Sequence, residues 1–147
     1  MNTRANKVLA IAVGALLLLA VVAALVSVRR PAVQFDAGTP EATVQSYVQD
    51  ILDGDLQGAA SLLDPEGGCT VDDLERGEFQ EPARVVVTNS SAQDETARVM
   101  VDLVYGEGPF AGQEYASNET FRLVRADSGW LIAGQPWPAY FCEDPKP

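Results

Sequence analysis

The chain has 147 residues, no histidine, two cysteines and a formal net charge of −11. The lack of histidine excludes Ser-His-Asp and Cys-His nucleophile systems, Asp-His dyads and histidine-based metal sites. All 21 acidic residues but only six of the ten basic ones lie after position 30, which leaves that part with a charge of about −15. Because nucleic-acid binding by counterion release requires clustered lysine and arginine, no nucleic-acid partner is expected for so acidic a chain.

An uncharged apolar stretch of 21 residues runs from Val8 to Val28. A helix of that length rises about 31 Å, which matches a hydrocarbon core of about 30 Å, and it has no polar stripe. We therefore predict a single-pass membrane anchor. We expect it to be retained because it exceeds the roughly 7–15 apolar residues of a cleaved signal. The alternative is secretion after cleavage, since Val22-Ala23-Ala24 suits a signal peptidase.

Basic residues flank this stretch on both sides, with Arg4 and Lys7 before it and Arg29 and Arg30 after it. Counting the amino terminus, the positive-inside rule leans toward a cytoplasmic N-terminus. Residues 1–30 are thus predicted to form the anchor with its flanks, and 31–38 a short tether.

Both cysteines, Cys69 and Cys142, lie in the part beyond the anchor. An even number of cysteines in an exported domain predicts a disulfide, and the alternative is two unrelated buried thiols. Together with the flanking charges, this places the C-terminal domain outside the cytoplasm, at the plasma membrane, in the cell envelope.

The first predicted element after the tether is a helix over 39–54. Thr39 suits the N-cap, Pro40 suits the first helical position, and Gly54 suits the left-handed position that ends a helix. Its apolar residues follow the helical spacing i, i+3, i+4, i+7, i+8. These residues are Val44, Tyr47, Val48, Ile51 and Leu52.

Two shorter helices are predicted next. Asp55 caps a helix over 56–64, and Pro65 stops it, so the first two helices form a hairpin. Thr70 followed three residues later by Asp73 resembles a capping box, which predicts one or two further helical turns.

The apolar period then changes to two, which predicts strands over 83–89, 96–105, 114–126 and 129–134. In the second strand, one face holds Ala97, Val99, Val101, Leu103 and Tyr105, and the other holds Arg98, Met100, Asp102 and Val104. Helices first and antiparallel strands afterwards indicate an α+β domain with the helices packed on one face of the sheet.

The opening "PEATVQSYVQDILDGDLQGAASLLDP" and the closing "GWLIAGQPW" resemble the nuclear transport factor 2-like superfamily over about residues 38–137. The similarity is greatest to exported or membrane-anchored actinobacterial members and to SnoaL-like proteins. It implies a cone-shaped, cystatin-like domain over 39–147, in which a curved antiparallel sheet wraps around the first helix and leaves an apolar pocket. Some members are isomerases, dehydratases or cyclases, and others only bind ligands or proteins.

The candidate pocket residues are Asp102, Tyr105 and Tyr115. Asp102 lies in an otherwise apolar strand and could act as a base if it lined the interior, while the tyrosines could donate hydroxyl groups. The alternative is an outward-facing Asp102 paired with Arg98 or Arg122 on a neighbouring strand. Tyr105 falls on the face opposite to Asp102.

The stretch "QPWPAYFC" (135–142) concentrates aromatic residues between prolines, which prevent a central strand. Trp137, Tyr140 and Phe141 either pack on the domain, with Cys142 fastening them to Cys69, or form a patch for a partner protein.

Two acidic clusters, at 50–55 and 72–75, do not match a twelve-residue calcium loop, so we expect no metal and no cofactor. The sequence therefore predicts a single-pass membrane protein with an exported, non-catalytic binding or scaffold domain and an envelope protein as partner. The alternative is a small-molecule-binding or isomerase- or dehydratase-like protein that uses the cone pocket.

Overall fold

The computed structural model describes residues 3–28, 33–106 and 114–142. Contacts within the chain divide it into two units, Met1–Gln34 and Phe35–Pro147, which are described separately. Arg29 and Arg30, which entered the prediction of membrane orientation, lie outside the described residues.

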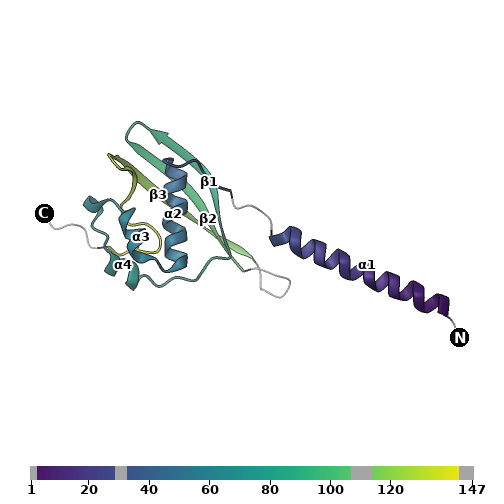
Figure 1. Ribbon diagram of the computed structural model, residues 1–147. Coiled ribbons are helices and arrows are strands. Elements are labelled where there is room, and N and C mark those ends of the chain that lie inside the picture. The colour runs from purple at the N-terminus through teal and green to yellow at the C-terminus, as the bar shows by residue number, and fades with distance from the viewer. Residues whose placement is uncertain (1–2, 29–32, 107–113, 143–147) are drawn as a thin grey trace. The chain divides into compact units, whose positions relative to one another are not determined.

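The first unit consists of helix α1, Thr3–Val28 (Figure 1). Within it, Asn6–Ala23 has a mean hydropathy of 2.3, and none of this window is buried. α1 is thus long and apolar enough to cross a membrane. A signal sequence near the N-terminus can pass the same test of length and composition, so retention and orientation stay predictions.

The second unit opens with helix α2, Pro40–Asp53, which confirms the first predicted element. The Thr39 hydroxyl accepts a hydrogen bond from the Ala42 N–H at 3.2 Å, and Gly54 ends the helix at φ 77°. A glycine adopts this left-handed conformation without a steric penalty. The side chains that α2 buries are Val44, Tyr47, Val48 and Ile51.

Helix α3, Leu56–Ser61, ends three residues earlier than its sequence pattern predicts. The chain leaves the helix because the backbone around Leu63 pairs with the last strand. The Asp64 N–H donates to the Ile132 carbonyl, and the Ile132 N–H donates to the Leu62 carbonyl, both at 2.8 Å. A short 3₁₀ turn, Pro65–Gly67, follows.

Helix α4, Val71–Arg76, begins with the predicted capping box. The Asp73 carboxylate accepts hydrogen bonds from the Thr70 N–H at 2.8 Å and from the Thr70 hydroxyl at 2.7 Å. It also forms an ion pair with Arg76. Asp73 is consequently only 9% exposed, unlike the solvated carboxylate that its acidic neighbourhood suggests.

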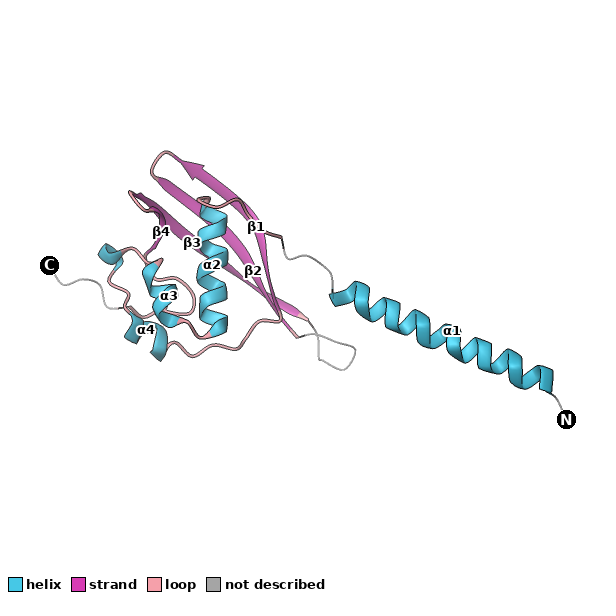
Figure 2. Ribbon diagram, in the orientation of Figure 1, coloured by secondary structure: helices cyan, strands magenta, loops and turns pink. Residues whose placement is uncertain are grey.

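Four antiparallel strands form one sheet in the order β1-β2-β3-β4 (Figure 2). They are β1 Arg84–Gln93, β2 Thr96–Tyr105, β3 Tyr115–Ala126 and β4 Gly129–Ala133. β1 continues four residues beyond its predicted end. Its polar second half stays paired with β2 after a bulge between Val87 and Asn89, because the ladder depends on backbone groups rather than on apolar side chains.

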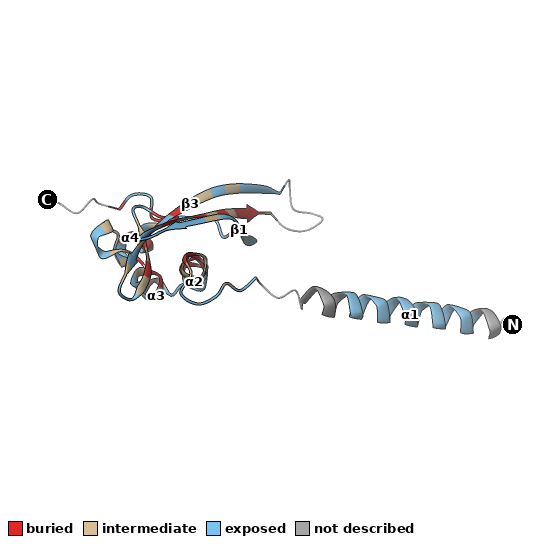
Figure 3. Ribbon diagram, turned by 90° about the horizontal axis from the view of Figure 1, so that it is seen from above, coloured by how far each residue is buried: buried red, intermediate tan, exposed pale blue. Residues whose placement is uncertain are grey.

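Helix α2, with α3 and α4 beside it, lies on one face of this sheet (Figure 3), so the predicted α+β class is confirmed. The core lies between α2 and the strands, where the Tyr47 and Phe121 rings meet edge to face with centroids 5.9 Å apart. Val99, Val101 and Leu103 of β2 are completely buried there.

The predicted disulfide is present. Cys69 and Cys142 are bonded, with their Cα atoms 4.9 Å apart. The alternative of two unrelated thiols is therefore wrong. The bond fastens the last described residue to the segment before α4 and closes a loop with a sequence separation of 73.

Candidate functional site

Asp102 lies on the outer face of β2, away from the helices. Its neighbours Val101 and Leu103 point into the core, and side chains alternate along a strand. The Asn118 side-chain amide, directly opposite on β3, donates a hydrogen bond to the Asp102 carboxylate at 2.8 Å. Asp102 thus faces outward as the alternative interpretation expects, but its partner is Asn118 rather than an arginine.

Tyr105 and Tyr115 come together on the inner face of the sheet. They are paired in the β2–β3 register, and their rings stack with centroids 4.9 Å apart and an interplanar angle of 19°. Tyr105 is 7% exposed and Tyr115 is 54% exposed. The Tyr115 hydroxyl donates to the Gln80 side-chain oxygen at 3.2 Å. The structure therefore groups two of the three candidate pocket residues and places the third on the other face.

A carboxylate that sequence reasoning missed lies on the same face of β3 as Tyr115, with Ser117 between the two residues on that face. Glu119 pairs with the buried Val101, so it projects from the inner face of β3, as Tyr115 does. The Ser117 hydroxyl donates to its carboxylate at 2.9 Å. A sequence signal existed: Phe121 and Leu123 belong to the core, and alternation from them puts Glu119 on the same face.

The C-terminal segment adds a third tyrosine. Burial and then a hydrogen bond to Glu119 raise the pKa of Tyr140. Burial, followed by the nearby Tyr115 and Glu119, also raises the pKa of Tyr105. Tyr105, Tyr115, Ser117, Glu119 and Tyr140 are hereafter called the tyrosine–glutamate cluster. Because the pKa values of Tyr105 and Tyr140 are raised, these two phenols are protonated at neutral pH and can donate hydrogen bonds.

The aromatic residues of segment 135–142 divide into two groups. Trp137 is 4% exposed and packs edge to face on Phe79, with ring centroids 4.9 Å apart. Tyr140 and Phe141 are 42% and 92% exposed. Trp137 thus packs within the domain, as the packing interpretation expects, whereas the Phe141 side chain is exposed on the surface.

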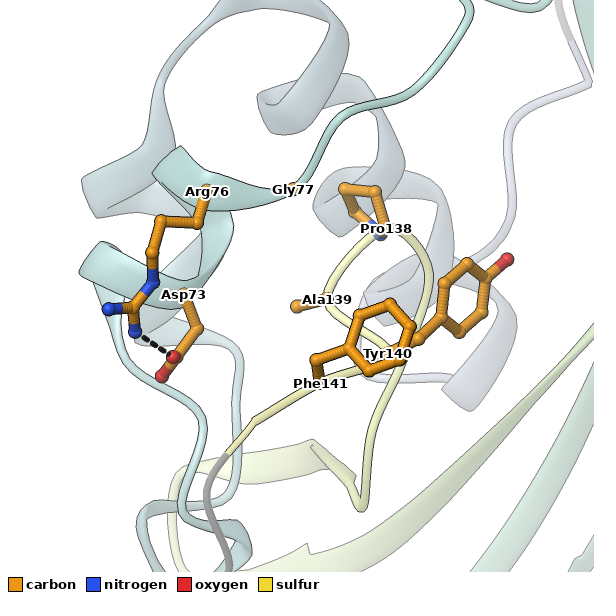
Figure 4. Close-up of a pocket in the computed structure, with 7 residues that line it drawn as sticks. All are labelled: Asp73, Arg76, Gly77, Pro138, Ala139, Tyr140 and Phe141. Atoms are coloured by element: carbon orange, nitrogen blue, oxygen red, sulfur yellow. Dashed lines mark hydrogen bonds and ion pairs between the residues drawn. The ribbon is translucent and has the colours of Figure 1, made fainter.

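A cavity of about 180 Å³ lies between α4 and this segment (Figure 4). The ion pair of Asp73 and Arg76 stands on one side, and the Tyr140 hydroxyl points away from it. The hydrogen bonds from Thr70, and then Arg76, hold the pKa of the Asp73 carboxyl below its usual range. The cavity is lined by Asp73, Arg76, Gly77, Pro138, Ala139, Tyr140 and Phe141.

Metal ligands do not gather among the described residues in groups of three or more. Near the end of α2, partial burial and then the charges of Asp55 and Asp53 raise the pKa of Asp50.

No protein-family model and no curated protein matches the sequence. The solved structures similar to this chain include a SEC-C motif-containing protein of Rhodopseudomonas palustris, with a TM-score of 0.55 and 20% identity, over 67% of this chain and 78% of the other. A protein described as an NTF2-like transpeptidase of Campylobacter jejuni has a TM-score of 0.45 and 15% identity, over 65% and 97% of the two chains. A protein described as an NTF2-like dehydratase of Streptomyces avermitilis has a TM-score of 0.38 and 14% identity, over 63% of this chain and 88% of the other.

At these identities the similarity concerns the fold alone, and TM-scores below 0.5 carry no argument about function. The fold and the site define an α+β domain that follows a helix of membrane-spanning length.

Proposed function

We propose that the protein is a single-pass membrane protein whose extracytoplasmic, nuclear transport factor 2-like domain binds an envelope protein without catalysing a reaction. The observation that supports this most is the exposure of Phe141, at 92%, next to a cavity walled by Gly77, Pro138 and Ala139. Exposed aromatic side chains at the edge of an apolar depression are typical of residues that dominate binding energy at protein interfaces.

Two further features favour binding over catalysis. Asp102, the candidate base, is turned away from the interior and hydrogen-bonded to Asn118. The interior itself is occupied by fully buried side chains such as Tyr47 and Phe121. The disulfide supports an extracytoplasmic domain, because such bonds persist in oxidising compartments.

Site-specific photocrosslinking in intact cells tests the proposal. A photoreactive phenylalanine analogue replaces Phe141 in one variant and Val86 in another. Val86 is a matched control because it is apolar, 44% exposed and on the outer face of β1. We expect one discrete adduct of the full-length protein from position 141 and none from position 86. Equal adducts from both positions, or none from position 141, would count against the proposal.

The second candidate function is binding of a small molecule in the domain. The tyrosine–glutamate cluster favours it, because phenol hydroxyls and a carboxylate converge on the inner face of the sheet. Titration with a defined small ligand distinguishes this function from protein binding. A small molecule should bind at the tyrosine–glutamate cluster, whereas the proposed protein-binding surface contains Phe141, which is not part of the cluster.

A further inference from the structure

We propose that the tyrosine–glutamate cluster binds a small alkylammonium compound. The proposal rests on the juxtaposition of a carboxylate that has no basic partner in the described residues with three tyrosine rings. It does not depend on the envelope partner proposed above, because it concerns Glu119 and its neighbours rather than Phe141.

The carboxylate is the first element of the site. The ion pairs among the described residues join Arg76 to Asp73 and Arg84 to Glu114, so Glu119 has no cationic partner there. Glu119 is half-buried, and the neutral hydroxyl of Ser117 donates a hydrogen bond to its carboxylate at 2.9 Å. A partly desolvated carboxylate of this kind gains stability from a cation that reaches it.

The tyrosine rings are the second element. The face of an aromatic ring carries negative electrostatic potential and attracts cations. Tyr105 covers one face of Tyr115, and the 54% exposure of Tyr115 leaves much of that ring open to a ligand. Tyr140, at 42% exposure, approaches the same carboxylate from the C-terminal segment.

The chemistry of the cluster selects the kind of cation. Calcium takes six to eight oxygen ligands, whereas this cluster offers one carboxylate and has no group of three metal ligands around it. An alkylammonium ion matches both elements, because its carbon groups contact the rings while its charge faces Glu119. The strongly acidic composition of the domain raises the local concentration of such cations.

The experiment is an NMR titration of the full-length protein in maltoside micelles, with choline as the probe and tyrosine carbons labelled. The chain has four tyrosines, of which three belong to the cluster and Tyr47 is completely buried in the core. We expect saturable shifts of the three cluster signals and an unchanged Tyr47 signal. The uncharged isostere 3,3-dimethyl-1-butanol should give no saturable shift. No saturation with choline, or equal responses to the two compounds, would overturn the proposal.

Variants test the role of the carboxylate. Glu119→Gln should weaken choline binding about tenfold, as expected for a cation–π site that loses its charge partner. Asp102→Asn removes the same charge from the opposite face of the sheet and should leave binding within about twofold, since only screened long-range attraction changes. Equal effects of both substitutions would refute a specific site. Tyr115→Leu provides a second variant that should also weaken binding, and the Tyr47 signal reports whether each variant is folded.

A lipid headgroup carries the same ammonium chemistry, so the protein is also placed in nanodiscs. Shifts of the cluster signals in phosphatidylcholine but not phosphatidylglycerol, without added choline, would identify the headgroup as the source. Shifts that require free choline in both lipids would identify a solute. Both results support the site, whereas the absence of cluster shifts under all conditions contradicts it.

Discussion

At the scale of single residues, two buried polar side chains show how differently the fold treats such groups. The Tyr47 hydroxyl is completely buried and has no hydrogen-bond partner among the described residues, and burial raises the pKa of Tyr47. Asp73 is nearly as inaccessible but is bonded to Thr70 and Arg76. An unpaired buried hydroxyl costs stability, whereas a paired carboxylate at a helix start contributes to it.

Replacing Asp73 with Asn should lower the free energy of unfolding by about 1–3 kcal/mol at pH 7, because the buried capping interactions lose their charge. The pKa of Asp73 is lowered in the folded state. The stability that the ionised Asp73 contributes is therefore fully present above its unfolded-state pKa of about 3.9. This contribution is lost as the pH falls through the pKa of Asp73 in the folded state.

Urea unfolding of the wild-type protein and the Asp73→Asn variant at pH 7 and pH 3 measures this contribution. The difference in the free energy of unfolding between the two proteins should be smaller at pH 3 than at pH 7. Asp72→Asn is the matched control, because Asp72 is the exposed neighbour in the same helix turn. A difference that stays constant with pH would show that the charge of Asp73 does not stabilise the fold.

At the scale of elements, local signals predicted the existence of each helix and strand better than their ends. α2 and the capping box of α4 carry their own stop and start signals, so the structure confirms them. The apolar pattern placed the end of α3 too late and the end of β1 too early. Both ends are determined by pairing with distant strands, through Ile132 for α3 and through β2 for β1.

Gly54→Ala should lower the free energy of unfolding by about 1 kcal/mol, because φ 77° is strained for a residue with a Cβ atom. A Cβ atom there would meet no other atom within 4 Å, so the cost comes from the backbone alone. Gly54→Asn is the control, since asparagine tolerates this conformation better and should lose less. Urea denaturation ranks the three proteins, and an alanine variant as stable as wild type would disprove the assignment.

At the scale of the whole molecule, the disulfide joins the segment that follows β4 to the segment that precedes α4. Cys142 ends the described segment that carries Trp137 and Tyr140, and Cys69 precedes α4. In the chain-entropy model, closing a loop of this length stabilises the folded state by about 4 kcal/mol. The bond therefore also holds the third tyrosine of the cluster near Glu119.

Replacing both Cys69 and Cys142 with serine should lower the free energy of unfolding by about 4 kcal/mol. In intact cells, the wild-type cysteines should react with an alkylating maleimide only after reduction, as expected for an oxidised extracytoplasmic domain. Gel mobility after alkylation with and without reductant measures this. Free thiols in untreated cells would contradict both the bond and the compartment.

The sequence by itself determined the apolar span, the α+β class and the α2 caps, because these depend on local spacing and composition. Alternation along β3 already puts Glu119 on the face of Phe121, but tertiary structure alone decided that Asp102 faces outward and that Tyr140 approaches Glu119. Which face of a strand is inner depends on the helix that covers it, and the approach of Tyr140 depends on a chain segment that begins beyond the last strand. Such proximity arises from long-range packing, which no periodicity along the chain encodes.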